Sequence, residues 1–173
     1  MSNIILIGFM GVGKSTISIR LSQLLGMESV EIDAVIVEQV GIPITEIFSE
    51  YGEDYFRKLE SNIIKGIKEK DNLIVSCGGG AVLHNDNIKK LKKGGYIVLL
   101  TASPTTIYER VRLSGDRPIL NGNMSVEYIS EVMEKRKPQY MYAADVVINT
   151  ELKTVDEICE EIIRYVNEQS DMN

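Results

Sequence analysis

A glycine-rich segment near the start of the chain holds the residues whose chemistry is easiest to interpret. Residues 8–15 read GFMGVGKS, in which a glycine, four residues and a second glycine precede Lys14 and Ser15. This is the spacing of the P-loop, whose backbone N–H groups and following helix dipole attract a phosphate. The lysine of such a loop reaches the β- and γ-phosphates of a nucleotide, and the serine hydroxyl binds Mg²⁺. The motif predicts a nucleotide site formed by Gly11, Val12, Gly13, Lys14, Ser15 and Thr16.

Two acids farther along the chain could complete this site. A P-loop enzyme usually takes a second metal contact from an acid that ends a neighbouring strand. The run Leu73–Cys77 offers none, whereas Glu31 and Asp33 stand at the end of a short strand. Side chains two residues apart on a strand point to the same side, so we expect one acid to serve the hydrated metal and the other an acceptor hydroxyl. Asp33 as a helix N-cap and Glu31 as a solvated side chain remain alternatives.

The elements that must position these residues alternate along the chain. The run Ile4–Ile7 is continuously apolar, which is typical of a parallel strand buried on both faces. Apolar residues at helical spacing follow from Ser15 until Gly26, a favourable C-terminal stop. A strand and a helix therefore flank the motif, as a functional P-loop requires and an incidental glycine turn does not.

The rest of the chain continues the alternation of strands and helices. Further strands are expected at 29–32, 73–77, 96–100 and 146–148, and helices at 33–40, at 52–69, from the glycines 78–80 to 91, from 103, at 125–142 and from the capping box 154–157. Residues 114–123 lack periodicity and are expected to form a mobile loop. The pattern predicts the α/β class, as a three-layer α/β/α sandwich around a five-stranded parallel sheet.

Size and charge limit the function classes. The chain has 173 residues, 44% of them apolar, which suits a single domain over residues 1–173. Nineteen Lys and Arg against 25 Asp and Glu give a net charge of −6, which would repel nucleic acids, so a small anion must be bound by locally concentrated arginines. Without a signal peptide or membrane span, and with Cys77 and Cys159 free to stay reduced, we expect a cytoplasmic protein with no membrane partner. Nothing requires more than a monomer.

The set of motifs resembles the shikimate kinase family, within the nucleoside-monophosphate-kinase-like branch of P-loop proteins. No single motif after the P-loop is specific, but the set is. The resemblance implies an enzyme that transfers the γ-phosphate of ATP to the 3-hydroxyl of shikimate, with Mg²⁺, in the route to chorismate and the aromatic amino acids. The likeness is carried, in family order, by residues 8–16, Glu31 and Asp33, Phe56-Arg57 with Glu60, 78–82 (GGGAV), 117–120 (RPIL), and Arg136 followed by Tyr140.

The resemblance also implies which residues bind the acceptor, in a region at about 33–60 and beyond it. Arg57 and Arg136 match the pair that binds the carboxylate of shikimate, for which guanidinium forks are suited. The backbone of Gly79 would approach the substrate, and Asp33 would orient the reacting hydroxyl. Alternatives from the residues alone are a surface ion pair of Arg57 with Glu60, a solvated charged face around Arg136, and a simple strand-to-helix turn at the glycines.

The remaining implied residues belong to the nucleotide. Arg117 falls in the family's lid, at about 112–124, where it would neutralise charge on the transferring phosphates together with Lys14. Arg110 and Lys153 fall where the family contacts adenine. A solvated loop position for Arg117 and a helix-surface role for Arg110 remain open.

Two rival functions are consistent with parts of the sequence. A gluconate or nucleotide kinase of the same fold would share the P-loop, and gluconate also offers a carboxylate and hydroxyls. A regulatory nucleotide-binding module would need only affinity, so Lys14, Ser15, Asp33 and Arg117 together favour an enzyme. Glu31 stands where the family commonly has the shorter Asp, which leaves both a direct and a water-mediated metal contact open.

Overall fold

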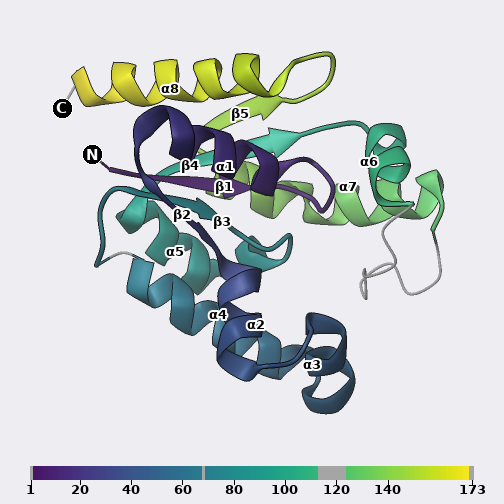
Figure 1. Ribbon diagram of the computed structural model, residues 1–173. Helices are drawn as coiled ribbons and strands as arrows, with labels where there is room; N and C mark the ends of the chain where they lie inside the picture. The colour runs from purple at the N-terminus through teal and green to yellow at the C-terminus, as the bar shows by residue number, and fades with distance from the viewer. Residues whose placement is uncertain (1, 68, 113–123, 172–173) are drawn as a thin grey trace.

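A parallel five-stranded sheet forms the centre of the protein, shown as a computed structural model in Figure 1, which describes residues 2–67, 69–112 and 124–171. The strand order is β2-β3-β1-β4-β5, and every neighbouring pair is parallel. The expected fold class is confirmed. The strands are β1 (Asn3–Ile7), β2 (Glu28–Glu31), β3 (Leu73–Ser76), β4 (Gly95–Thr101) and β5 (Val146–Asn149).

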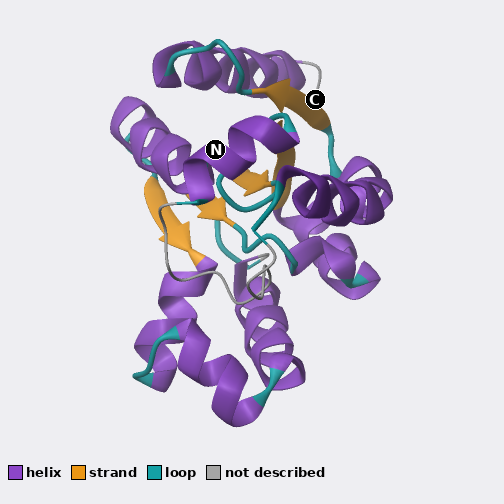
Figure 2. Ribbon diagram, turned by 90° about the vertical axis from the view of Figure 1, so that its right-hand side faces the viewer, coloured by secondary structure: helices purple, strands orange, loops and turns teal. Residues whose placement is uncertain are grey.

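Helices cover both faces of the sheet and extend beyond one edge. In Figure 2 the carboxyl ends of the strands face the viewer, and helices lie on either side of them. Helices α1 and α8 pack on one face; α4, α5 and the C-terminal part of α7 pack on the other. The helices are α1 (Lys14–Leu25), α2 (Ile32–Val40), α3 (Ile44–Tyr51), α4 (Glu53–Ile67), the 3₁₀ turn η1 (Ala81–Leu83), α5 (Asn85–Gly94), α6 (Pro104–Val111), α7 (Val126–Ala143) and α8 (Val155–Asp171).

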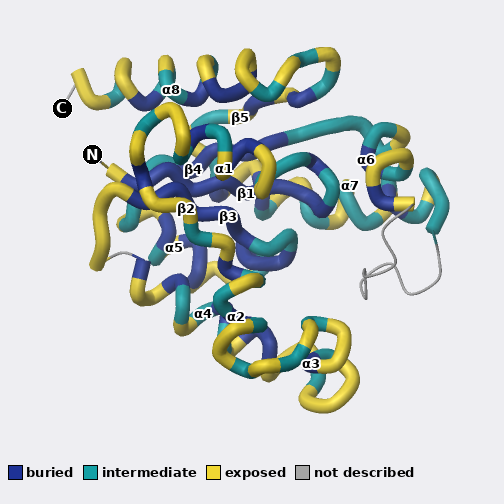
Figure 3. The backbone as a smooth tube through the Cα atoms, in the orientation of Figure 1, coloured by how far each residue is buried: buried dark blue, intermediate teal, exposed yellow. Residues whose placement is uncertain are grey.

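The central strand explains why its sequence is apolar without interruption. Ile4 and Leu6 belong to the core under α1 and α8, whereas Ile5 and Ile7 belong to the core under α4 and α5. All four are at most 1% exposed, and each such side chain contributes about 1.5–3 kcal/mol by burial. Figure 3 shows the contrast between these buried strands and the more exposed α3. A strand fixed on both faces is a rigid support for the loop that follows it.

Several local predictions are confirmed. Ser103 caps α6 by accepting a hydrogen bond from the Thr106 amide at 3.3 Å. Thr154 and Glu157 form the expected reciprocal capping box at the start of α8, with bonds of 2.7 and 3.2 Å. Within the described ranges, no helix has both the length and the apolar composition of a membrane span.

The structure differs from the sequence prediction at three places. Residues 44–51 form α3, a helix that was not predicted although Ile44, Ile47, Phe48 and Tyr51 have helical spacing. The second strand ends at Glu31 rather than at residue 32, and Ile32 opens α2. The segment after the glycines is divided into η1 and α5, because His84 is extended between them. The expected loop at 114–123 lies outside the described residues.

Candidate active site

The P-loop connects the central strand β1 to α1 at the carboxyl edge of the sheet. Gly8 has a φ of 145° and Gly13, the residue before α1, a φ of 107°, values that favour glycine because a side chain is strained there. A Cβ at Gly8 would also overlap the carbonyl of Leu100 on β4. The Lys14 ammonium donates to the carbonyls of Gly8 and Phe9 at 2.8 and 3.1 Å. The loop is therefore a compact turn with a cation at its mouth.

Ser15 and Glu31 meet at this mouth. The Ser15 hydroxyl donates to Oε1 of Glu31 at 2.6 Å, although the residues lie on different elements. Glu31 is the last residue of β2 and is exposed. Because its carboxylate accepts this bond from the P-loop serine, the alternative of a purely solvated side chain is wrong. Hydroxyl and carboxylate oxygens are the ligands that Mg²⁺ prefers, and Mg²⁺ commonly takes only one or two of them from the protein. The pair fits that ion.

Asp33 lies in the first turn of α2, where Glu31 is the N-cap residue. The N-cap alternative for Asp33 is therefore wrong, and so is the argument from strand alternation, because only Glu31 belongs to the strand. Asp33 nevertheless lines the same cavity as Glu31. A carboxylate in a first helical turn also interacts favourably with the helix dipole.

A cavity of about 480 Å³ unites these groups. It extends from the glycine turn, past the P-loop, toward the start of α8. Every expected nucleotide residue within the described ranges lines it. The lining includes Gly11, Val12, Gly13, Lys14, Ser15, Thr16, Glu31, Asp33, Gly78, Gly79, Arg110 and Lys153.

Two positively charged side chains that line the cavity away from the P-loop lysine, Arg110 and Lys153, each have a partner within the protein. Arg110 on α6 donates to the carbonyls of Val12 and Gly11 at 3.2 and 3.4 Å, so it lies against the P-loop rather than on a free helix surface. Lys153 forms an ion pair with Glu161 at 2.8 Å. Both are expected adenine neighbours, and both line the cavity.

The glycine turn after β3 is where the polar side chains converge. A Cβ at Gly78 would lie 2.7 Å from Oδ1 of Asp33 and 3.0 Å from Oε1 of Glu60. At Gly79 it would lie 3.7 Å from the Arg136 guanidinium, and at Gly80 it would overlap the guanidinium of Arg57.

None of these three glycines has the positive φ that excludes other residues. They are needed for space, because the acids and arginines occupy the volume that side chains would fill.

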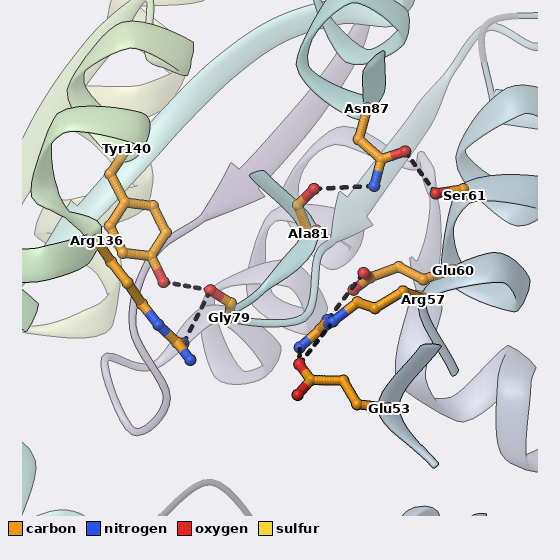
Figure 4. A network of polar contacts seen from close by, with 9 residues as sticks. All are labelled: Glu53, Arg57, Glu60, Ser61, Gly79, Ala81, Asn87, Arg136 and Tyr140. Atoms are coloured by element: carbon orange, nitrogen blue, oxygen red, sulfur yellow. Dashed lines mark hydrogen bonds and ion pairs between the residues drawn. The ribbon is translucent and has the colours of Figure 1, made fainter. Parts of the chain in front are cut away.

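Arg57 does pair with Glu60, but both side chains are buried. The alternative of an ion pair on the protein surface is therefore wrong. Its guanidinium donates to Glu60 at 2.9 Å and to Glu53 at 3.0 and 3.2 Å (Figure 4). Arg57 is 8% exposed and Glu60 is 0% exposed. Because a buried charge is costly unless it is paired, the two acids hold the guanidinium in one place.

Burial raises the pKa of Glu60 to about 6, and the neighbouring Asp33 charge acts in the same direction. Arg57 opposes both effects by its charge and its hydrogen bond. For Arg57, burial alone would lower the pKa, but Glu60 and Glu53 together raise it. At neutral pH the pair is therefore charged on both sides.

Arg136 approaches the turn from the opposite direction. Its guanidinium lies 5.7 Å from the centre of the Phe9 ring and donates to the Gly79 carbonyl at 3.4 Å. Its neighbours Lys135 and Lys137 are exposed, while Arg136 is half-buried. The charged run is therefore solvated except at the one residue that faces the glycine turn.

Sequence reasoning missed several groups around this turn. Glu53 lies four residues before Arg57, a spacing that suggests an ion pair on a helix, but nothing in the sequence shows that the pair is buried. The Tyr140 hydroxyl donates to the Gly79 carbonyl, and Asn87 donates to the Ala81 carbonyl (Figure 4).

A parallel sheet with a P-loop and a helix at the carboxyl end of its central strand defines the class: P-loop proteins of the kinase type. A family model described as shikimate kinase matches residues 10–167. A shikimate kinase of Thermodesulfovibrio yellowstonii is 43% identical over 164 residues, 95% of this chain and 94% of that protein. The chain belongs to the shikimate kinase family.

Solved structures agree with the sequence comparison. The shikimate kinase of Acinetobacter baumannii in complex with shikimate has a TM-score of 0.92 and 28% identity, covering 98% of this chain and 94% of that one. The shikimate kinase of Aquifex aeolicus has a TM-score of 0.84 and 32% identity, covering 97% and 98%. The expected fold and family are therefore confirmed over nearly the whole chain.

Proposed function

We propose that this chain transfers the γ-phosphate of ATP to the 3-hydroxyl of shikimate, giving shikimate 3-phosphate and ADP. The observation that carries the proposal is a pair of guanidinium groups beside consecutive glycines, Arg136 at Gly79 and Arg57 at Gly80, next to a P-loop. Guanidinium pairs with carboxylate through parallel N–H bonds, and shikimate has one carboxylate on a ring of hydroxyls. The arrangement suits an anionic alcohol presented to a triphosphate.

Arg57 keeps the capacity to bind such a ligand. Of the five N–H groups of a guanidinium, three donate to Glu53 and Glu60 within the described part of the chain. The other two are available to an acceptor. A guanidinium already fixed by two acids loses little freedom when it binds, which favours affinity.

Asp33 is assigned to the reacting hydroxyl. It would accept a hydrogen bond from the 3-hydroxyl and align that oxygen with the γ-phosphate for in-line attack. Lys14 and Arg117 would neutralise charge on the transferring phosphoryl group. Arg117 and most of the proposed lid, at about 112–124, lie outside the described residues, so their role rests on the family resemblance.

The nucleotide is assigned to the other end of the cavity. The amides of residues 11–16 would bind the phosphates, and Arg110 and Lys153 would lie near adenine. Ser15 and Glu31 would hold Mg²⁺, which neutralises phosphate charge when it is bound. Support for the metal comes from the oxygen chemistry of this pair and its 2.6 Å contact.

The proposal extends to the setting of the enzyme. We assign residues 1–173 to one domain that acts as a monomer in the cytoplasm, in the route to chorismate and the aromatic amino acids, without a nucleic-acid or membrane partner. The supports are the net charge of −6 and two buried cysteines that form no disulfide, Cys77 and Cys159.

A panel of acceptors tests the activity. ADP release is measured with Mg-ATP and shikimate, gluconate or AMP at equal concentrations, with and without the protein. We expect turnover with shikimate and only background with the other two. Equal turnover with gluconate would transfer the assignment to a gluconate kinase, and nucleotide binding without any acceptor-dependent turnover would indicate a regulatory module.

A further inference from the structure

The glycine turn is held by hydrogen bonds from both of its sides (Figure 4). On one side, α7 supplies the Tyr140 hydroxyl and the Arg136 guanidinium, and both donate to the carbonyl of Gly79. On the other side, the Asn87 amide on α5 donates to the carbonyl of Ala81 at 3.0 Å. Two carbonyls that lie two residues apart are therefore fixed by side chains from different helices.

Asn87 extends this second connection to the helix that carries Arg57. The Ser61 hydroxyl on α4 donates to Oδ1 of Asn87 at 2.8 Å, and Ser61 directly follows Glu60. The turn, α5 and the Arg57–Glu60 pair are thus joined through one amide. Asn87 is 1% exposed, and a buried amide with both ends bonded is a specific restraint on its neighbours.

The bonds to Gly79 restrain more than one carbonyl. The peptide between Gly79 and Gly80 is planar, so the Gly79 carbonyl and the Gly80 N–H point in opposite directions as one unit. Three successive glycines have much conformational freedom to lose on folding, so a turn made of them needs such restraints. Fixing this carbonyl therefore also orients the Gly80 N–H, which points away from the Tyr140 hydroxyl.

Tyr140 is suited to this task by its environment. It is 6% exposed and packs in the core under α4 and α5, so its ring cannot move freely. Burial raises its pKa, while the charge of Arg136 opposes that shift. The hydroxyl therefore keeps its proton and remains a donor.

We infer that Tyr140 and Asn87 are positioning residues for the acceptor, which hold the glycine turn in the arrangement that places its amides and the two arginines around the substrate. The inference rests on the proposed function. Neither residue needs to touch the substrate. Their loss is expected to weaken acceptor binding more than nucleotide binding, because within the described residues their hydrogen bonds hold the glycine turn and not the P-loop.

The main test removes only the hydroxyl, in Tyr140→Phe. The shikimate KM, and the shikimate Kd from calorimetry, should rise about fivefold to tenfold, as expected for one lost hydrogen bond of about 1 kcal/mol. The ADP Kd should stay within about twofold. The matched control is Tyr165→Phe, whose hydroxyl donates to the Asp145 carbonyl at 3.4 Å, far from the cavity, and which should change neither constant.

A second, gentler variant tests the Asn87 side. Ser61→Ala keeps Asn87 in place but removes the hydrogen bond that orients its amide, so the shikimate KM should rise about twofold to threefold. Ser170→Ala, which removes a hydroxyl bonded to the Val166 carbonyl near the end of α8, is the control and should behave as wild type.

The outcomes separate the two proposals. If the wild-type chain does not phosphorylate shikimate, the proposed function and the inference both fall. If the wild type is active and Tyr140→Phe and Ser61→Ala bind shikimate as well as it does, only the inference falls. A parallel loss of shikimate and ADP affinity with a lower Tm would also overturn it, because that pattern indicates general structural damage.

Discussion

The two halves of the candidate site are built in different ways. The proposed nucleotide half centres on one continuous segment, residues 8–16, whose backbone amides and lysine would bind the phosphates, with Arg110 and Lys153 beside it. The acceptor half gathers its groups from α2, α4, α7 and the glycine turn, and its central ion pair between Arg57 and Glu60 is buried. The difference shows that phosphate binding can be encoded locally, whereas recognition of the acceptor depends on how distant helices pack.

The largest effect should come from the residue that lies between the halves. Asp33→Asn keeps the size of the side chain but removes the charge that would orient the reacting hydroxyl, so kcat should fall about 1,000-fold. The chain should fold and bind ADP with normal affinity. Single-turnover assays and calorimetry measure the two quantities, and a near-normal kcat would remove Asp33 from the chemical step.

A smaller but still large effect should be confined to the acceptor half. In Gly80→Ala the new methyl group would overlap the Arg57 guanidinium, whose carbon lies 2.5 Å from the Cβ position. Displacing this group should lower kcat/KM for shikimate about 100-fold, with the ADP Kd unchanged.

Gly66→Ala is the control for that substitution. Gly66 lies inside α4, and a Cβ there meets no atom within 4 Å. This variant should be active and slightly more stable, because alanine is favoured in a helix. An equal loss of ADP affinity in Gly80→Ala would mean that the two halves are not independent.

The buried pair should also give the acceptor half its own pH dependence. Glu60 has a pKa of about 6 in the folded chain against 4.5 as its ordinary value, so between these values the folded state holds a proton that the unfolded state has lost. The free energy of unfolding should therefore fall as pH rises through this window.

Comparison with Glu60→Gln isolates this effect. The change in pKa from 4.5 to about 6 corresponds to about 2 kcal/mol. The stability of the wild type relative to Glu60→Gln should therefore decrease by about that amount between pH 4 and pH 7. Urea unfolding at several pH values measures it. A difference that stays constant with pH would show that the Glu60 carboxyl is not shifted in the folded protein.

The smallest effect should appear in the nucleotide half. Arg110→Ala removes the side chain that donates to the carbonyls of Gly11 and Val12, and the KM for ATP should rise about threefold. The shikimate KM should stay unchanged. A rise in the shikimate KM alone would contradict the division of the site into two halves.

The same contrast explains what the sequence could predict. The P-loop and the buried strand β1 follow from local spacing and an unbroken apolar run, and both are confirmed. Helix α3 was missed although Ile44, Ile47, Phe48 and Tyr51 have helical spacing, because its 8 residues give only about two turns of pattern. The burial of Arg57 was missed because the spacing of residues on a predicted helix shows which side chains are neighbours, but it does not show which face of the helix other elements cover.

Hydrogen bonds between residues far apart in the sequence could not be predicted, for a related reason. Tyr140 and Gly79 are 61 residues apart, and Ser61 and Asn87 are 26 apart. No periodicity links such positions, and a single tyrosine at helical spacing is equally consistent with ordinary core packing. The family resemblance supplied Arg57 and Arg136, but the groups that hold the turn between them emerge only when the helices are assembled.

The three glycines of the turn also differ in how they could be redesigned. A methyl group at Gly78 or Gly80 would displace a charged side chain, but at Gly79 its nearest neighbours would lie at 3.5 and 3.7 Å, which is ordinary contact. Position 79 is thus where the acceptor cleft could be narrowed by one carbon while both arginines stay in place. It offers an engineer a starting point for changing which alcohols the cleft admits.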